Sequence, residues 1–315
     1  MSFESVYRNS ALILTEGALA ERLKSEFRLK MDPHINHAGF IYQEPQVLEK
    51  LYRQYIEIGR KHDLPEMVMT PTRKVNVESL GRSEFHHRNI LSDAVTFLRN
   101  IRESYGGYAD KILIGGLLGC KGDAYSGEKR LNALEAYHFH KQQTSKFQRE
   151  ETDFLFAGIM PEIQEATGMA RAMSETGIPY IISFMVQHDG CLLDGTSIAD
   201  AISFIDQETS PEPVCYFTNC IHPANFRAAL NNAKNKGKLQ MNRLTGTQAN
   251  ASALSCADLN NCDTLHQDDF NNIIEEMLSL QKDSGIKVFG GCCGTDDRFM
   301  EVLAEKLILA VSQDK

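Results

Sequence analysis

Long apolar runs are absent from this sequence. Near the N-terminus, an apolar stretch extends only from Ala11 to Leu14 before Glu16 interrupts it, which is too short for the hydrophobic region of a signal peptide. No segment approaches the roughly 20 apolar residues that a membrane-spanning helix needs. We therefore expect a cytoplasmic protein with no membrane partner.

Clustered positive charge is also absent. The chain has 33 Lys and Arg residues against 42 Asp and Glu residues, which gives a formal net charge of -9. Affinity for nucleic acid comes mostly from clustered Lys and Arg side chains that neutralise phosphates. The composition therefore argues against a nucleic-acid partner.

Internal linkers are the third absence. No Gly/Ser linker, low-complexity tract or block of like charge divides the 315 residues, of which 42% are hydrophobic. A chain of this length and composition is able to bury a large core. We interpret residues 1–315 as one domain.

A strand-then-helix pattern repeats along the whole chain. Short apolar runs are each followed by a turn and a stretch with helical spacing of apolar residues, which is typical of βα units around a parallel sheet. The runs cover 11–14, 66–69, 111–114, 153–156, 179–186, 213–217, 238–244 and 286–289, and predicted helices include 45–61, 131–147, 163–176, 197–206, 225–233 and 268–282. This pattern favours an α/β fold, a single (β/α)8 TIM barrel, although an open doubly wound sheet would have the same periodicity. In both folds the chemistry belongs at the carboxyl ends of the strands.

Cysteines follow two of the predicted strands. Cys220 comes after the sixth strand, and Cys292 and Cys293 come after the eighth. The separation of 72 positions from Cys220 to Cys292 excludes a local zinc finger, so the fold has to bring them together. Glycines on both sides of the adjacent pair give the backbone freedom to turn both side chains toward one ion.

Three thiolates on Zn2+ would leave one tetrahedral position open, as a catalytic zinc site requires. Zinc lowers the pKa of an incoming thiol, and three sulfur ligands keep the bound thiolate nucleophilic. Alkyl transfer to sulfur is the natural use of such a site. The alternatives for these cysteines are buried packing or a disulfide between the adjacent pair. The other thiols show no partner spacing and are predicted to be packing or surface residues: Cys120, Cys191, Cys215, Cys256 and Cys262.

The sequence "GGCCGT" at 290–295, together with the pair Asn219 and Cys220, resembles the zinc signature of the homocysteine S-methyltransferase family. "ILTEGALAERL" and "IISFMVQHDGCLLDGTSIADAI" are similar to two further segments of that family. The resemblance implies a (β/α)8 barrel that transfers a methyl group to the metal-bound thiolate of homocysteine, forming methionine. It also implies Zn2+ as cofactor, held by Cys220, Cys292 and Cys293, with a small-molecule thiol and a methyl donor as partners.

The same resemblance suggests substrate-binding residues near the strand ends. Glu16 stands where the family has Asp, and polar contacts are expected after the second strand and on the fifth. Each has a structural alternative: a turn cap, strand-end hydrogen bonds or a core hydroxyl. The substrate-binding candidates are Glu16, Gly17, Thr70, Thr72, Ser183 and Glu162.

The fourth strand departs from the family pattern. Ala157 and Gly158 replace the family's "ET", whose Glu is expected to bind the amino group of the substrate, and Glu162 or Glu16 would have to replace it. The family's "YPN" after the seventh strand is replaced by "LTGTQAN" at 244–250. Two alternatives therefore stay open: a zinc-dependent methyl or alkyl transferase for another small thiol, and a non-enzymatic zinc- or redox-binding barrel. The sequence does not identify the methyl donor, and a homo-oligomer stays possible.

Overall fold

The computed structural model describes residues 2–125, 130–148, 151–254 and 268–313. Eight parallel strands pair in chain order and close into a barrel, with β8 beside β1. The predicted (β/α)8 barrel is therefore confirmed, and the open doubly wound sheet is excluded. The strands are β1 (Ile13–Thr15), β2 (Glu66–Met69), β3 (Ile112–Gly119), β4 (Phe154–Met160), β5 (Tyr180–Phe184), β6 (Cys215–Ile221), β7 (Leu244–Ala249) and β8 (Val288–Gly291).

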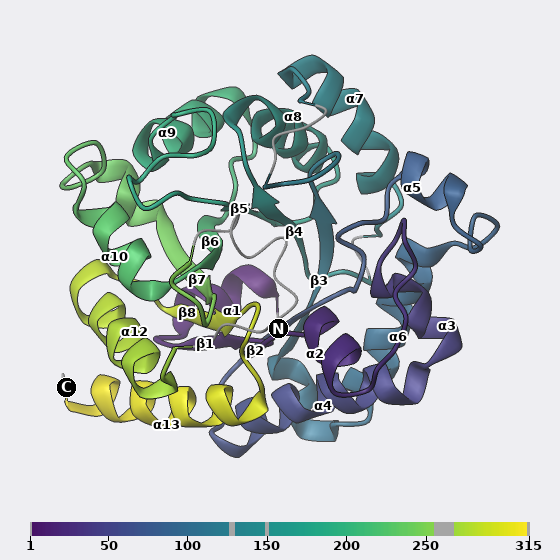
Figure 1. Cartoon of the computed structure of the whole chain (residues 1–315), viewed down its shortest axis with the longest axis horizontal. Coiled ribbons are helices and arrows are strands. Elements are labelled where there is room, and N and C mark those ends of the chain that lie inside the picture. Colours follow the sequence, from purple (N-terminus) through teal and green to yellow (C-terminus); the bar gives the residue numbers. More distant parts are fainter. Residues whose placement is uncertain (1, 126–129, 149–150, 255–267, 314–315) are drawn as a thin grey trace.

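Helices surround the sheet as an outer ring (Figure 1). Their ends follow local signals: α4 has Pro45 in its first turn, α7 begins at a capping box between Asn132 and Glu135, and α12 ends at Gly285 with a φ of 68°. The α-helices are α1 (Phe3–Asn9), α2 (Ala20–Ser25), α3 (Phe40–Gln43), α4 (Pro45–Lys61), α5 (Val77–Arg82), α6 (Ile90–Glu103), α7 (Ala133–Thr144), α8 (Ile163–Ser174), α9 (Ile198–Glu208), α10 (Pro223–Asn231), α12 (Phe270–Ser284) and α13 (Asp297–Gln313). Short 3-10 helices are η1 (His37–Gly39), η2 (Gly106–Lys111) and η3 (Leu239–Arg243). Among the described residues, no helix is long and apolar enough to cross a membrane.

The core has two layers, because successive side chains of a strand point to opposite faces of the sheet. The inner layer fills the barrel and contains Met67, Phe154, Phe156 and Phe217, with the rings of Phe156 and Phe217 5.4 Å apart. The outer layer lies between the sheet and the helices and is larger. Aromatic side chains thus fill the inside of the barrel, which is a solid core rather than a channel.

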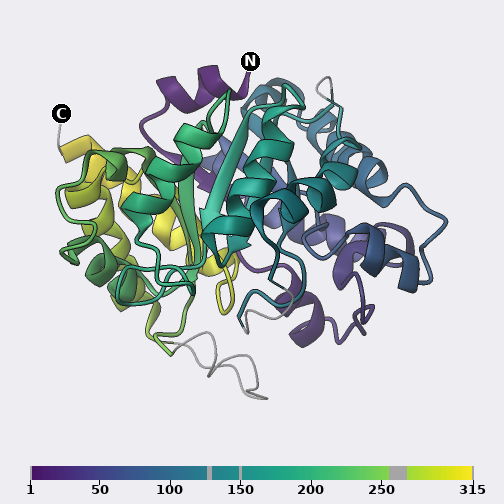
Figure 2. The ribbon, with the colours of Figure 1, turned by 90° about the horizontal axis from the view of Figure 1, so that it is seen from above.

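Helix α1 lies across one end of the barrel (Figure 2). The Phe3 ring stacks on Phe154 at the start of β4 with ring centroids 4.9 Å apart. The Tyr7 hydroxyl lies 2.8 Å from the Thr245 hydroxyl at the start of β7. Because α1 closes the amino end of the barrel, the carboxyl end is the one left for a site.

The prediction of the seventh strand was wrong. Residues 239–243 form η3, and Leu239 is 80% exposed, whereas β7 begins only at Leu244. The apolar alternation of Leu239 and Met241 imitates a strand, while the true strand carries Thr and Gln side chains whose polar groups are satisfied inside the barrel. The segment 244–250, predicted to follow the strand, is therefore mostly the strand itself.

Candidate functional site

The three cysteines predicted as metal ligands lie together at the carboxyl end of the barrel. Their sulfur atoms are all within 4.8 Å of one another and could hold a metal ion. Cys220 is buried, Cys292 is half-buried and Cys293 is exposed. The structure pairs Cys220 with Cys292 as a disulfide, with 5.6 Å between their Cα atoms, and leaves Cys293 free.

Cys220 leaves the regular pleat of its strand. The sequence placed it beyond the sixth strand, but it lies inside β6, one residue before the end of the strand. Its φ of 53° is rare for a residue with a side chain, and the register between β6 and β7 shifts between Asn219 and Ile221. This irregularity directs the Cys220 side chain toward Cys292.

Glycines at the end of β8 allow close packing against β1. A Cβ atom at Gly290 would lie 1.8 Å from the Thr15 hydroxyl oxygen, and one at Gly291 would lie 2.1 Å from the Thr295 hydroxyl oxygen. Larger residues would push the chain segment that carries Cys292 away from the barrel. The two glycines of "GGCC" therefore have a packing role that sets the position of the cysteines.

A hydrogen-bonded network of side chains lies beside Cys220 inside the barrel. The Asn219 amide donates to the Gln248 side chain, which in turn donates to the Thr15 hydroxyl at 2.9 Å. The Asn219 side-chain oxygen accepts from the backbone amide of Ile159 at 3.1 Å. The network joins β1, β4, β6 and β7. Sequence reasoning missed Gln248, because it placed the seventh strand too early, and it missed Thr15, because it ended the first strand at residue 14.

Glu16 is a buried carboxyl with one unsatisfied oxygen. One carboxyl oxygen accepts from the Met69 backbone amide at 3.2 Å, and the other has no hydrogen-bond partner among the residues that the structure describes. Burial raises the pKa of Glu16 to about 8. Such a group favours a cationic partner. At the next residue, a Cβ atom on Gly17 would lie 2.9 Å from the Tyr55 ring, so the backbone of Gly17 passes close to that ring.

Thr70 and Thr72 lie at the end of β2 and bond to its neighbour β3. Their hydroxyls are 2.7 Å apart, Thr70 accepts from the Leu117 amide at 2.9 Å, and Thr72 donates to the Leu117 carbonyl at 2.7 Å. These contacts match the structural interpretation of strand-end hydrogen bonds. Ser183 lies two residues after Ile181 on β5, so it faces the inner layer as Ile181 does. Its buried hydroxyl has no partner in the described parts of the chain.

The fourth strand requires a correction. Ala157 belongs to the outer layer, whereas Gly158 has the inward parity of Phe154 and Phe156. A Cβ atom at Gly158 would lie 3.0 Å from the Leu117 side chain. Gly158, not Ala157, therefore occupies the position from which a carboxylate would reach the barrel interior.

Glu162 lies at the N-cap of α8 and not inside the barrel. Its carboxylate is paired with Arg130, with 2.6 Å between Nε and Oε1. A substrate ammonium would have to compete with this guanidinium. Glu16 is thus the better placed of the two acids suggested by the sequence.

Two polar side chains next to the cysteines were not identified from the sequence. The Tyr125 hydroxyl donates to the Cys220 sulfur at 3.5 Å. The Glu21 carboxylate accepts a hydrogen bond from the backbone amide of Gly294, which follows the cysteine pair. Both contacts join segments distant in sequence, and neither has a motif that would reveal it.

A cation also lies close to the cluster. Desolvation raises the pKa of the Cys293 thiol and the Glu21 carboxylate raises it further, whereas the Arg73 guanidinium lowers it. Arg73 is half-buried and follows β2. An acid and a cation therefore both act on the Cys293 thiol, and the effect of the acid is the larger.

The remaining thiols lie elsewhere. Cys120, Cys191 and Cys215 are buried, as predicted for packing residues, and Lys234 donates to the Cys191 sulfur at 2.9 Å. Cys256 and Cys262 lie outside the described residues.

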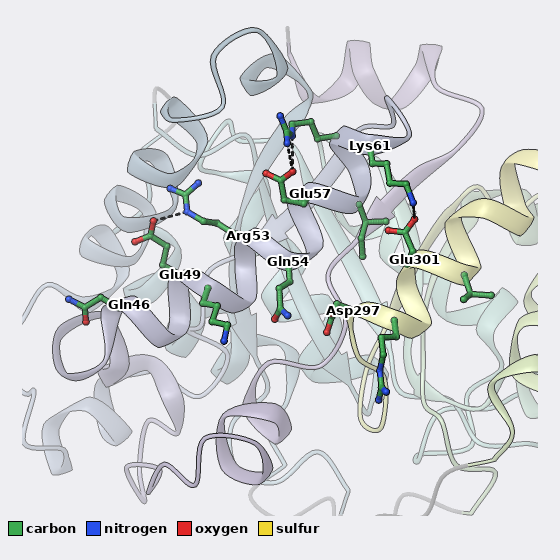
Figure 3. A pocket seen from close by; sticks show the side chains of 13 residues that line it. Gln46, Glu49, Arg53, Gln54, Glu57, Lys61, Asp297 and Glu301 are labelled. Carbon is green, nitrogen blue, oxygen red and sulfur yellow. Dashed lines mark hydrogen bonds and ion pairs between the residues drawn. The ribbon is translucent and has the colours of Figure 1, made fainter.

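A charged groove lies on the outer wall between α4 and α13 (Figure 3). Its charged groups largely pair with one another: Arg53 contacts Glu49, and Lys61 contacts Glu301 at 2.5 Å. It contains none of the predicted site residues. The carboxyl end of the barrel remains the candidate site.

A closed parallel barrel with polar groups and thiols gathered at its carboxyl end defines a (β/α)8 barrel enzyme. A comparison with protein families matches residues 13–307 to the homocysteine S-methyltransferase family. The chain therefore belongs to this family, whose reaction is transfer of a methyl group to homocysteine.

Solved structures support the same fold. The metallated form of the homocysteine methyltransferase MmuM from Escherichia coli superposes with a TM-score of 0.74 at 18% identity, covering 96% of this chain and 98% of that chain. Its oxidized form gives 0.73 and its apo form 0.68, each at 18% identity and covering 95% of this chain and 97% of that chain. A comparison with curated protein sequences finds no match.

Proposed function

We propose that Cys220, Cys292 and Cys293 hold one Zn2+ ion and that the chain methylates homocysteine at this site. The observation that carries the proposal is the gathering of three sulfur atoms within 4.8 Å at the carboxyl end of the barrel. Sulfur ligands favour zinc over the harder divalent ions. When bound, zinc would supply an open position that takes up the substrate thiol as thiolate at neutral pH.

The side chains of the protein position the cluster and the substrate. The network of Asn219, Gln248 and Thr15 fixes the strand end that carries Cys220. Tyr125 donates to the sulfur of Cys220, which reduces the negative charge that this sulfur carries. Glu16 offers its unsatisfied carboxyl oxygen to the substrate ammonium, which would favour the ionised form of that carboxyl.

The reaction itself is a substitution at carbon. The thiolate sulfur of homocysteine forms a bond to the methyl carbon of the donor, and the bond between methyl and donor breaks with its electron pair remaining on the donor. The buried position of the network excludes water from one side of the sulfur.

Another small thiol is the second candidate substrate, favoured by one observation. Gly158 leaves the inward position on β4 without a carboxylate, so the amino group of homocysteine has one acid fewer to meet. A thiol without an amino group would lose little there.

The test is loss of a single sulfur. Cys220→Ala should lower the zinc content well below about one ion per chain and abolish methyl transfer, while the far-ultraviolet circular dichroism stays unchanged. Cys215→Ala is the matched control, because it removes a buried thiol from the same strand outside the cluster. Elemental analysis under reducing conditions and a methyl-transfer assay measure both effects. Full zinc content and activity in Cys220→Ala would exclude this cysteine from the site.

A further inference from the structure

The segment after β2 carries a cation held in a defined place. Its backbone is fixed by hydrogen bonds from the Thr70 amide to the Gly115 carbonyl and from the Val75 amide to the Thr72 carbonyl, both 2.8 Å. A Cβ atom at Gly119 would lie 2.6 Å from the Arg73 carbonyl oxygen and 2.7 Å from its Cγ. The missing side chain of Gly119 therefore creates the space in which Arg73 packs against β3.

The guanidinium of Arg73 has no carboxylate within ion-pair distance among the described residues. Half-buried arginines usually pair with an acid, because an unpaired buried charge is costly. The neighbouring Lys74 has the opposing charge of Asp123 beside that of Arg73. An anion beside Arg73 would give this guanidinium the acid partner that it lacks in the described part of the chain.

The position of this charge relates it to the cysteine cluster. Arg73 follows β2 and packs against Gly119 at the end of β3, so it lies at the same carboxyl end of the barrel as the cysteine cluster. In homocysteine the thiol and the carboxylate are separated by three carbon atoms. A substrate whose sulfur lies at the cysteine cluster would carry its acid group along this end of the barrel, where Arg73 is a guanidinium without a carboxylate partner among the described residues.

We propose that Arg73 binds the carboxylate of the thiol substrate, so that the chain recognises its substrate mainly by the acid group. A guanidinium can hold a carboxylate with two parallel hydrogen bonds. The proposal rests on the proposed function, because it requires the sulfur to lie at Cys220, Cys292 and Cys293. It agrees with Gly158, which supplies no acid for the amino group.

Three thiols separate the contributions of the two charged groups. Calorimetric titrations of the zinc-loaded protein should use homocysteine, mercaptobutyrate, which lacks the amino group, and aminopropanethiol, which lacks the carboxylate. We expect the two acids to bind within about tenfold of each other and aminopropanethiol to bind at least about tenfold more weakly than homocysteine. Arg73→Met should weaken both acids by about tenfold or more and leave aminopropanethiol unchanged. Arg73→Lys, which keeps the charge without the planar fork, should fall between the two.

The matched control is Lys74→Met, which removes the same charge from the adjacent residue. Equal losses in Lys74→Met and Arg73→Met would overturn the proposal, since net charge alone would then explain the effect. It would also fail if Arg73→Met left thiol affinities unchanged and altered only the affinity for the methyl donor. Zinc content is measured for every variant. If no thiol bound to zinc-loaded wild-type protein, both the proposed function and this inference would fail, whereas equal binding of all three thiols would overturn the inference alone.

Discussion

At the scale of single residues, Glu16 has the clearest physical signature in the site. Its raised pKa of about 8 means that the folded protein binds a proton more tightly than the unfolded chain. The resulting stabilisation is fully present below the unfolded value near 4.5 and is lost as the pH rises through about 8. Once this buried carboxyl is ionised, the stabilisation is gone. The free protein therefore loses stability by holding the carboxyl ready for a cationic group of the substrate.

The first prediction follows from this pH window. Between pH 5 and about 8, wild-type protein should lose at least about 1 kcal/mol of unfolding free energy relative to Glu16→Gln, which has no group to ionise. Denaturant unfolding at several pH values measures the difference. Parallel pH profiles for the two proteins would show that Glu16 titrates near its ordinary pKa.

The second prediction concerns the missing acid on β4. Gly158→Glu should increase the preference for homocysteine over mercaptobutyrate, because the new carboxylate reaches the barrel interior, with Leu117 shifting by a few tenths of an ångström. Ala157→Glu is the matched control and should destabilise the protein without changing the preference, because it buries a charge in the outer layer. Competition binding and unfolding measurements distinguish them. A larger preference in Ala157→Glu would contradict the assigned faces.

The same two residues show where sequence reasoning about the site ends. The sequence predicted that Cys220, Cys292 and Cys293 come together, as they do, because cysteines at strand ends carry a strong chemical signal. It could not decide which of Ala157 and Gly158 points inward, because in a strand buried on both faces every residue is apolar or small and the alternation has no visible phase. Contacts such as those of Tyr125 and Glu21 depend on how distant segments meet.

At the scale of elements, most of the fold could be predicted. The helix predicted at 45–61 is α4 with the same bounds, because Pro45 and the apolar spacing define it. The seventh strand could not be found, since its buried polar residues are satisfied by tertiary hydrogen bonds between Thr247 and Thr218 and between Gln248 and Thr15. The hydrophobic pattern therefore does not predict the position of a strand whose buried polar side chains form hydrogen bonds across the barrel.

Helix α1 gives the third prediction. Phe3→Ala should lower the unfolding free energy by about 3 kcal/mol, because it removes a buried ring that stacks on Phe154 at the closed end of the barrel. Zinc content and methyl transfer should stay unchanged, since the site lies at the opposite end. Leu239→Ala, at an 80% exposed position, is the control and should change stability by less than about 0.5 kcal/mol. A loss of zinc in Phe3→Ala would show that the two ends are coupled.

At the scale of the whole molecule, the cysteine cluster joins strands that are distant in the chain. Cys220 and Cys292 are 72 residues apart, on β6 and after β8, so any bond between them closes a large loop. The sequence left a disulfide between the adjacent Cys292 and Cys293 open as an alternative, whereas the structure pairs Cys220 with Cys292. A metal and a disulfide would therefore compete for the same sulfur atoms, and the proposed zinc-bound state requires reduced protein.

The last prediction is that zinc stabilises the entire barrel. A ligand that binds only the folded state raises its stability by roughly 2.7 kcal/mol at a free concentration one hundred times its Kd. For a chain of this size that corresponds to roughly 4 °C in Tm. Under reducing conditions, stripping the metal with a chelator should lower Tm by this amount, and adding zinc back should restore it. Cys293→Ala should lose most of the shift, because the cluster then has two sulfur ligands, whereas Cys215→Ala should retain it. Equal Tm values for stripped and zinc-loaded wild-type protein would mean that the three cysteines hold no zinc in the folded chain.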